Sequence, residues 1–142
     1  IVGKDAIVEH GSAFYEVLDL NIGRCAFALA TKKGTDFFSG YKRKTVASKY
    51  PKVAKEFFKS KGMDVDVIKI EGSVELAPLL GLADGIVDIV ETGSTLKENG
   101  LEVVEKIMPI SARVIVNMAS MKLRKDEIEP FLRDIELAAQ VG

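Results

Sequence analysis

Strand-like and helix-like segments alternate between residues 45 and 96, and this alternation is the strongest constraint on the fold. Short runs of strand-forming residues occupy positions 45–48, 65–70 and 86–90. A helical pattern that begins at Pro51 separates the first two runs, and proline suits the first turn of a helix. Strands that alternate with helices form βαβ units with right-handed crossovers. The pattern therefore predicts an α/β fold with a mostly parallel sheet.

Further elements are expected within this region and on both sides of it. A helix at residues 5–10 with a stop at Gly11 comes first, and two short helices lie inside the region, one capped by Ser73 and one at residues 95–99. The apolar pattern predicts the remaining elements, which are strands at residues 25–30, 101–110 and 113–117 and a helix at residues 126–141.

Charge and composition exclude several classes of function. The 20 basic and 21 acidic residues give a net charge of -1, so an anion must be held by a local site, and nucleic acid is not an expected partner. No apolar run approaches the roughly 20 residues that a membrane helix needs. The single cysteine, Cys25, permits no intrachain disulfide and favours a reducing, cytoplasmic location.

The loop of residues 91–95 lies between a predicted strand and a predicted helix, where α/β sheets bind ligands. Gly93 allows a tight turn, and hydroxyl groups surround it in a pattern that suits a phosphate monoester. Nearby carboxylates suit ribose hydroxyls or a magnesium ion on a second, pyrophosphate group. Ordinary helix capping explains the hydroxyls equally well. The residues concerned are Asp88, Glu91, Thr92, Gly93, Ser94 and Thr95.

A second loop, at residues 71–75, also runs from a strand to a helix. Glu75 is expected in the first helical turn, projecting toward the same sheet edge as Asp88. Taken alone, this loop favours simple capping by Ser73. Lys49 and the basic cluster at residues 42–44 are expected to form a solvated face rather than a polyphosphate site.

The spacing of residues from Glu75 to Leu96 resembles the signature of the ATP phosphoribosyltransferase family, the first enzyme of histidine biosynthesis. The pattern runs from Glu75 through Gly81, Asp88 and the Thr-Gly-x-Thr loop without a departure. Outside this window, the resemblance continues at residues 3–5, 45–51 and 114–117, with Ser48 where the family more often has threonine.

The resemblance implies a two-lobed fold of the type II periplasmic-binding-protein kind, with the active site in the cleft. Residues 25–117 would form the second lobe, which binds phosphoribosyl pyrophosphate. Residues 1–24 and 118–142 would be pieces of the first lobe. The family's opening strand would precede Ile1, so the first lobe is expected to be incomplete and this chain alone to be inactive or poorly folded.

The implied reaction is the magnesium-dependent transfer of a phosphoribosyl group from phosphoribosyl pyrophosphate to N1 of ATP. Residues 91–95 would hold the 5-phosphate, and Asp88 would contact the ribose hydroxyls. Glu75 and Asp5 match family positions that line the nucleotide and ribose pocket. No side chain stands out as a general base, and no metal ligand is assigned.

The chain ends before any appended histidine-binding domain, so the resemblance implies the short form of the enzyme. Short forms depend on a regulatory subunit that resembles a histidyl-tRNA synthetase, and both homo- and hetero-oligomers are expected. Two alternatives remain open, a two-lobed solute-binding protein for a small anion and another phosphoribosyltransferase. The separation of Asp88 from Glu91 argues against purine salvage enzymes, whose two acids are usually adjacent.

Overall fold

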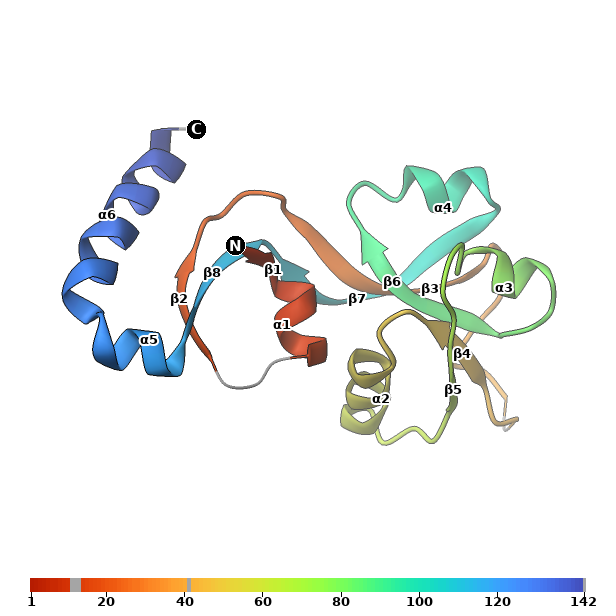
Figure 1. Cartoon of the computed structure of the whole chain (residues 1–142). Helices are drawn as coiled ribbons and strands as arrows, with labels where there is room; N and C mark the ends of the chain where they lie inside the picture. The colour runs from red at the N-terminus through yellow and green to blue at the C-terminus, as the bar shows by residue number, and fades with distance from the viewer. Residues whose placement is uncertain (11–13, 41, 142) are drawn as a thin grey trace. The chain divides into compact units, whose positions relative to one another are not determined.

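The chain divides into two compact units in the computed structural model, which describes residues 1–10, 14–40 and 42–141 (Figure 1). Unit 1 combines Ile1–Arg24 with Ile110–Gly142, and unit 2 is Cys25–Pro109. Unit 2 ends at Pro109, whereas the second lobe predicted from the sequence extends to Asn117. The helix stop predicted at Gly11 lies outside the described residues.

Unit 2 is built on a five-stranded sheet with the strand order β5-β4-β6-β3-β7. Strand β4 is parallel to both of its neighbours, with Ala47 beside Ile68 of β5 and Ile86 of β6. Strand β3 is antiparallel to β6. The bounds of the strands are Cys25–Lys32 for β3, Thr45–Ser48 for β4, Asp66–Lys69 for β5, Gly85–Val90 for β6 and Leu101–Ile110 for β7.

The parallel arrangement predicted from the alternation is confirmed for β4, β5 and β6. It does not extend to β3 or to unit 1, where the described pairings are antiparallel, so the expectation of mostly parallel sheets was too broad. The physical reason is connectivity. A parallel pair needs a crossover. The helices at residues 51–60 and 76–79 supply crossovers between β4, β5 and β6, whereas the described residues between β3 and β4 form no helix.

Helices cover both faces of this sheet, with α2 (Pro51–Ser60) and α4 (Ser94–Glu98) on opposite sides (Figure 1). Helix α2 buries Phe58, whose ring lies 5.7 Å from that of Phe37. Helix α3 (Leu76–Leu79) shares a second apolar cluster with α4 and the sheet. The buried members of that cluster are Ala30, Ala47, Val74, Ala77, Ile86, Leu96 and Leu101.

Three strand-to-helix connections lie at one edge of the sheet, because β4, β5 and β6 run in the same direction. Residues 49–50 lead from β4 into α2, residues 70–75 lead from β5 into α3, and residues 91–93 lead from β6 into α4. This shared edge carries both loops that the sequence marked as candidate ligand sites.

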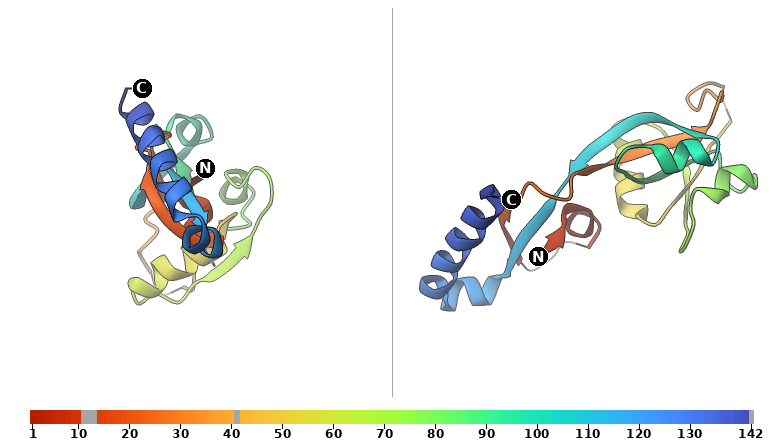
Figure 2. Two further views of the ribbon diagram at one scale, coloured as in Figure 1. Left: turned by 60° about the vertical axis from the view of Figure 1, so that its left-hand side comes forward. Right: turned by 90° about the horizontal axis from the view of Figure 1, so that it is seen from above.

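Unit 1 holds a three-stranded antiparallel sheet with the order β1-β8-β2. The sequence did not predict β2 or α5, and Figure 2 shows β8 leading directly into α5 and then α6. No helix in the described part of the chain is long and apolar enough to cross a membrane. The bounds are Val2–Gly3 for β1, Lys4–His10 for α1, Phe14–Asp19 for β2, Ala112–Asn117 for β8, Met118–Leu123 for α5 and Lys125–Val141 for α6.

Ion pairs join the strands of this smaller sheet. Arg113 of β8 contacts Glu16 at 2.7 Å and Asp19 at 3.3 Å, and Lys4 contacts Glu16 at 2.6 Å. The Ser111 hydroxyl donates a hydrogen bond of 2.7 Å to Asp19, and this bond is the main cause that lowers the pKa of Asp19. Side-chain interactions thus reinforce the ladder of unit 1.

Replacing Phe58 with alanine should destabilise the protein by about 3–5 kcal/mol, because a fully buried ring would leave a cavity between α2 and Phe37. Phe38→Ala is the matched control: Phe38 is 41% exposed, and we expect a loss of about 1 kcal/mol. Urea unfolding of both variants measures the two losses. Equal losses would show that α2 does not anchor the core.

Candidate functional site

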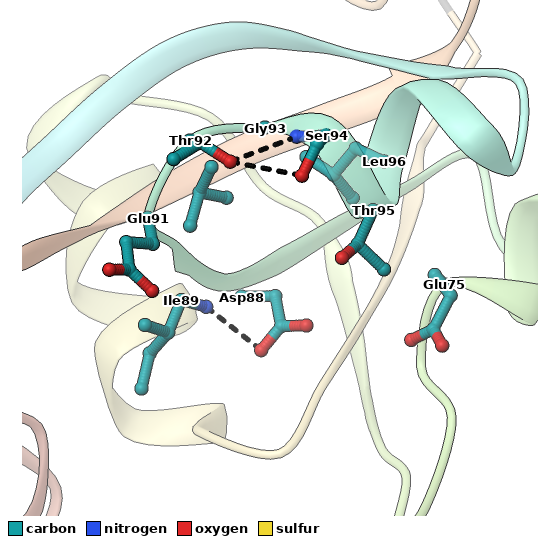
Figure 3. Close-up of a pocket in the computed structure, with 10 residues that line it drawn as sticks. Glu75, Asp88, Ile89, Glu91, Thr92, Gly93, Ser94, Thr95 and Leu96 are labelled. Carbon is teal, nitrogen blue, oxygen red and sulfur yellow. Dashed lines mark hydrogen bonds between the residues drawn. The ribbon is translucent and has the colours of Figure 1, made fainter.

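A pocket of about 250 Å³ opens at the carboxyl edge of the parallel strands in unit 2 (Figure 3). It is lined by Glu75 and by every residue from Asp88 to Leu96. The structure therefore brings together all of the predicted site residues except Asp5, which belongs to helix α1 of unit 1. The loop before α3 and the loop before α4 form one site rather than two.

Gly93 shapes the loop between β6 and α4. Its φ of 80° lies in the left-handed region, where residues with a side chain are strained. Gly93 also occupies the N-cap position of α4. The turn therefore depends on glycine, and the predicted reason for a glycine at this position is confirmed.

The hydroxyl groups around Gly93 contribute little to capping the helix, because the N-cap residue itself is a glycine. Helix α4 has no side-chain cap hydrogen bond, although the Thr92 hydroxyl accepts a long bond of 3.4 Å from the Ser94 N–H. The Thr92 and Ser94 hydroxyls lie 3.0 Å apart, as Figure 3 shows. The structure gives the Thr95 hydroxyl no hydrogen bond to any described residue. Capping by the Thr92 hydroxyl is therefore weak, and it does not account for the hydroxyl of Thr95.

The predicted cap at Ser73 is wrong. Helix α3 begins at Leu76, with Glu75 at its N-cap position and no side-chain cap hydrogen bond. The Ser73 carbonyl instead accepts a bond of 3.3 Å from the Leu76 N–H, which makes a turn before the helix. Because the helix starts later than expected, Glu75 stands at its entrance and its side chain is directed to the pocket (Figure 3).

Asp88 is the half-buried carboxylate of the site. Burial raises its pKa above the ordinary value of 3.8, and the nearby Glu75 carboxylate adds to the rise. A hydrogen bond of 2.8 Å from the Ile89 N–H and the positive charge of Lys49 oppose this increase. Desolvation outweighs these two effects, and hydrogen bonds from a bound ligand would favour the charged form of Asp88.

No lysine or arginine lines this pocket in the described structure. Arg43 of the basic cluster pairs instead with Asp64 at 3.0 Å and with Asp66 at 2.9 Å, and all three side chains are exposed. The prediction of a solvated basic face is confirmed for Arg43. An anion in the pocket would be held mainly by neutral hydroxyl and backbone N–H donors.

Asp5 lies in the first turn of α1, and its carboxylate is packed against the backbone of Gly3. A Cβ atom at Gly3 would collide with the Asp5 carboxylate oxygen. The colliding atom is the end of a flexible side chain, so glycine favours this position of the Asp5 carboxylate and a larger residue would displace it.

Sequence reasoning missed the apolar wall of the pocket, which consists of Ile89, Val90 and Leu96. An apolar residue in a strand gives no signal that distinguishes a pocket wall from the core. Among the described residues, no group of three or more histidine, cysteine, aspartate or glutamate side chains could hold a metal ion.

The fold and the pocket define an α/β protein whose strand-to-helix loop presents hydroxyls beside a half-buried carboxylate. A family model described as ATP phosphoribosyltransferase matches residues 1–137. An ATP phosphoribosyltransferase from Clostridium kluyveri is 61% identical over 137 residues, which cover 96% of this chain. The chain belongs to the ATP phosphoribosyltransferase family, and it spans 63% of the length of that relative.

Solved structures agree with this family. The ATP phosphoribosyl transferase (HisG:HisZ) complex from Thermotoga maritima contains a chain that is 34% identical, with a TM-score of 0.88 over 99% of this chain and 69% of its own length. A mutant of ArgBP from the same organism is 18% identical, with a TM-score of 0.59 over 89% of this chain and 58% of its own length. The second likeness shows the fold alone and confirms the predicted periplasmic-binding-protein-like class.

The carboxyl carbon of Asp88 should titrate above 3.8 in a ¹³C nuclear magnetic resonance titration, because burial disfavours the charged form. Lys49→Gln should raise this pKa further by removing a favourable charge, and Glu75→Gln should lower it by removing a repulsive one. Asp19 is the internal control, since its pKa should lie below 3.8 in the same spectra. Shifts of the opposite sign in the two variants would contradict the described electrostatics.

Proposed function

We propose that the pocket binds the phosphoribosyl part of phosphoribosyl pyrophosphate. We also propose that the whole protein transfers this group to N1 of ATP, as the first step of histidine biosynthesis. The observation that carries the proposal is the placement of a loop rich in hydroxyl groups beside Asp88 and Glu75 in one pocket. A sugar phosphate suits this combination, because its phosphate oxygens accept hydrogen bonds and its sugar hydroxyls donate them.

The 5-phosphate is assigned to the loop from Glu91 to Thr95. Thr92, Ser94 and Thr95 offer hydroxyl donors, and the first N–H groups of a helix have no acceptor within the helix itself. The left-handed Gly93 carries no side chain, so a phosphate oxygen can approach the backbone closely. Neutral donors of this kind bind a phosphate without a lysine or arginine.

Asp88 and Glu75 are assigned to the sugar side of the ligand. A carboxylate repels a phosphate at short range but accepts hydrogen bonds from ribose hydroxyls. Both side chains face the pocket from outside the 91–95 loop, Asp88 from β6 and Glu75 from the entrance of α3 (Figure 3). Asp5 is assigned to the nucleotide and ribose pocket through its match to the family's Gly-x-Asp turn.

The reaction forms a bond between N1 of adenine and C1 of the ribose, while the bond from C1 to the pyrophosphate oxygen breaks. Pyrophosphate leaves with the electron pair of that bond, and positive charge develops on the ribose ring in the transition state. Binding residues contribute by orienting the ribose and fixing its 5-phosphate. Magnesium enters with the pyrophosphate of the substrate, and no residue is assigned as its ligand or as a general base.

The partners of the whole protein are also proposals. The Thermotoga maritima chain was solved as a HisG:HisZ complex, which supports assembly of this protein with a second kind of subunit. We propose that this subunit is regulatory and resembles a histidyl-tRNA synthetase. Homo-oligomers and a cytoplasmic location fit the same function. The alternative of a solute-binding protein has support only from the shared fold, and no feature of the pocket favours it.

Gly93→Ala and Thr95→Ala should each raise the Kd for phosphoribosyl pyrophosphate about 10- to 100-fold, because each disturbs donors to a charged group. The Kd for ATP should change much less. Isothermal titration of the full-length protein measures both constants. Gly62→Ala is the control for Gly93→Ala, because Gly62 is also a left-handed glycine, with a φ of 70°, and lies outside the pocket. Thr35→Ala, at an exposed threonine, is the control for Thr95→Ala. Equal losses for both ligands would contradict the assignment of the loop.

Asp88→Asn should reduce turnover by the full-length protein while leaving its fold intact, because the amide is isosteric but no longer a charged acceptor. Turnover is followed by the ultraviolet absorbance of phosphoribosyl-ATP in a mixture of ATP, phosphoribosyl pyrophosphate and magnesium. Circular dichroism serves as the control for folding. Wild-type kinetics in this variant would remove Asp88 from the site.

A further inference from the structure

Ser48 is a fully buried hydroxyl residue at the carboxyl end of β4, next to the pocket strand β6. Its hydroxyl donates a hydrogen bond of 2.6 Å to the carbonyl of Val87. The same oxygen accepts a bond of 2.9 Å from the Tyr50 N–H. One small side chain therefore joins β6 to the turn between β4 and α2.

The two partners of Ser48 flank residues that bear on the site. Val87 directly precedes Asp88, which turns its carboxylate to the pocket. Tyr50 directly follows Lys49, whose charge acts on Asp88. The Ser48 hydroxyl thus links the backbone beside Asp88 to the backbone beside its positive neighbour.

The turn from β4 to α2 needs such a link for a local reason. Pro51 begins α2 and keeps the preceding Tyr50 out of the helical conformation, with a φ of -122° and a ψ of 69°. The β4 ladder ends at Ser48, so the Tyr50 N–H finds its acceptor in a side chain. The Tyr50 ring also packs edge-on against Phe27 of β3, with 5.0 Å between ring centroids.

We propose that Ser48 is a positioning residue, whose hydroxyl holds Lys49 and Asp88 in fixed relation so that the pocket binds the ribose phosphate productively. The proposal rests on the function proposed above for the pocket. Ser48 itself is not among the residues that line the pocket, so its effect must pass through the backbone that it joins.

A purely structural role would have different consequences. If Ser48 only stabilised the sheet, its replacement would lower the unfolding free energy and leave ligand affinity and turnover of the folded protein unchanged. A positioning role requires a loss that appears in the folded protein, and this loss must depend on the hydroxyl rather than on side-chain volume.

Ser48→Thr and Ser48→Val provide a matched pair, because the two new side chains have the same shape and only threonine keeps the hydroxyl. In the full-length protein, we expect Ser48→Thr to stay within about threefold of wild type. Ser48→Val should bind phosphoribosyl pyrophosphate about tenfold more weakly, with little change for ATP. Equal affinities in the two variants would overturn the proposal.

A second readout needs no substrate and separates failure of this proposal from failure of the proposed function. The charged groups at Asp88 are Lys49, Glu75 and the pocket residue Glu91. If Ser48→Val releases Lys49, the pKa of Asp88 should be higher than in Ser48→Thr. In a Lys49→Gln background, this difference should vanish. A difference that persists there, or one that is absent in both backgrounds, would refute the role of Ser48.

The single variant Lys49→Gln can still overturn the proposal if Ser48→Val does not fold. Lys49 is exposed, so its replacement should be tolerated. This variant should raise the pKa of Asp88 and weaken phosphoribosyl pyrophosphate binding by a factor similar to that expected for Ser48→Val. An unchanged pKa together with wild-type affinity would overturn the proposal without any measurement on Ser48.

Discussion

The parallel pairing of β4 with β5 and β6 is the constraint on which the site depends. Because these strands run in one direction, their carboxyl ends meet at one edge, and three connections into helices are gathered there. Glu75 and Asp88 are 13 residues apart in sequence but line the same pocket for this reason. The Ser48 hydroxyl reinforces this geometry where the ladder of β4 ends.

The electrostatics of the pocket are unusual for a site proposed to hold a phosphate. Its described lining contains three carboxylates and no basic side chain. Burial raises the pKa of Asp88, and Lys49 only partly opposes this effect. Hydroxyls and backbone N–H groups can satisfy a phosphate, while the carboxylates remain available to sugar hydroxyls, so the two halves of one ligand meet different chemistry. On the proposed function, this division accounts for the acidic residues that stand beside the 91–95 loop.

Much of the fold could be predicted because local patterns in this chain agree with their surroundings. The alternation in residues 45–96 identified the βαβ region, and Gly93 marked a turn that does adopt a left-handed conformation. Prediction failed where local signals were weak or ambiguous. Ser73 looked like a helix cap, but α3 begins three residues later. Strand β2 and helix α5 had no clear pattern, although Asn117 does cap α5 by accepting bonds from two backbone N–H groups.

The sequence by itself determined the family resemblance, the order of the main elements and the identity of the residues around the loop. These features depend on residue types and their spacing along the chain. Only the tertiary structure decided that Glu75 and the 91–95 loop share a pocket, and that Ser48 joins β6 to the turn between β4 and α2. Both features depend on contacts between residues that are far apart in the sequence, and such contacts leave no periodic trace in a single sequence.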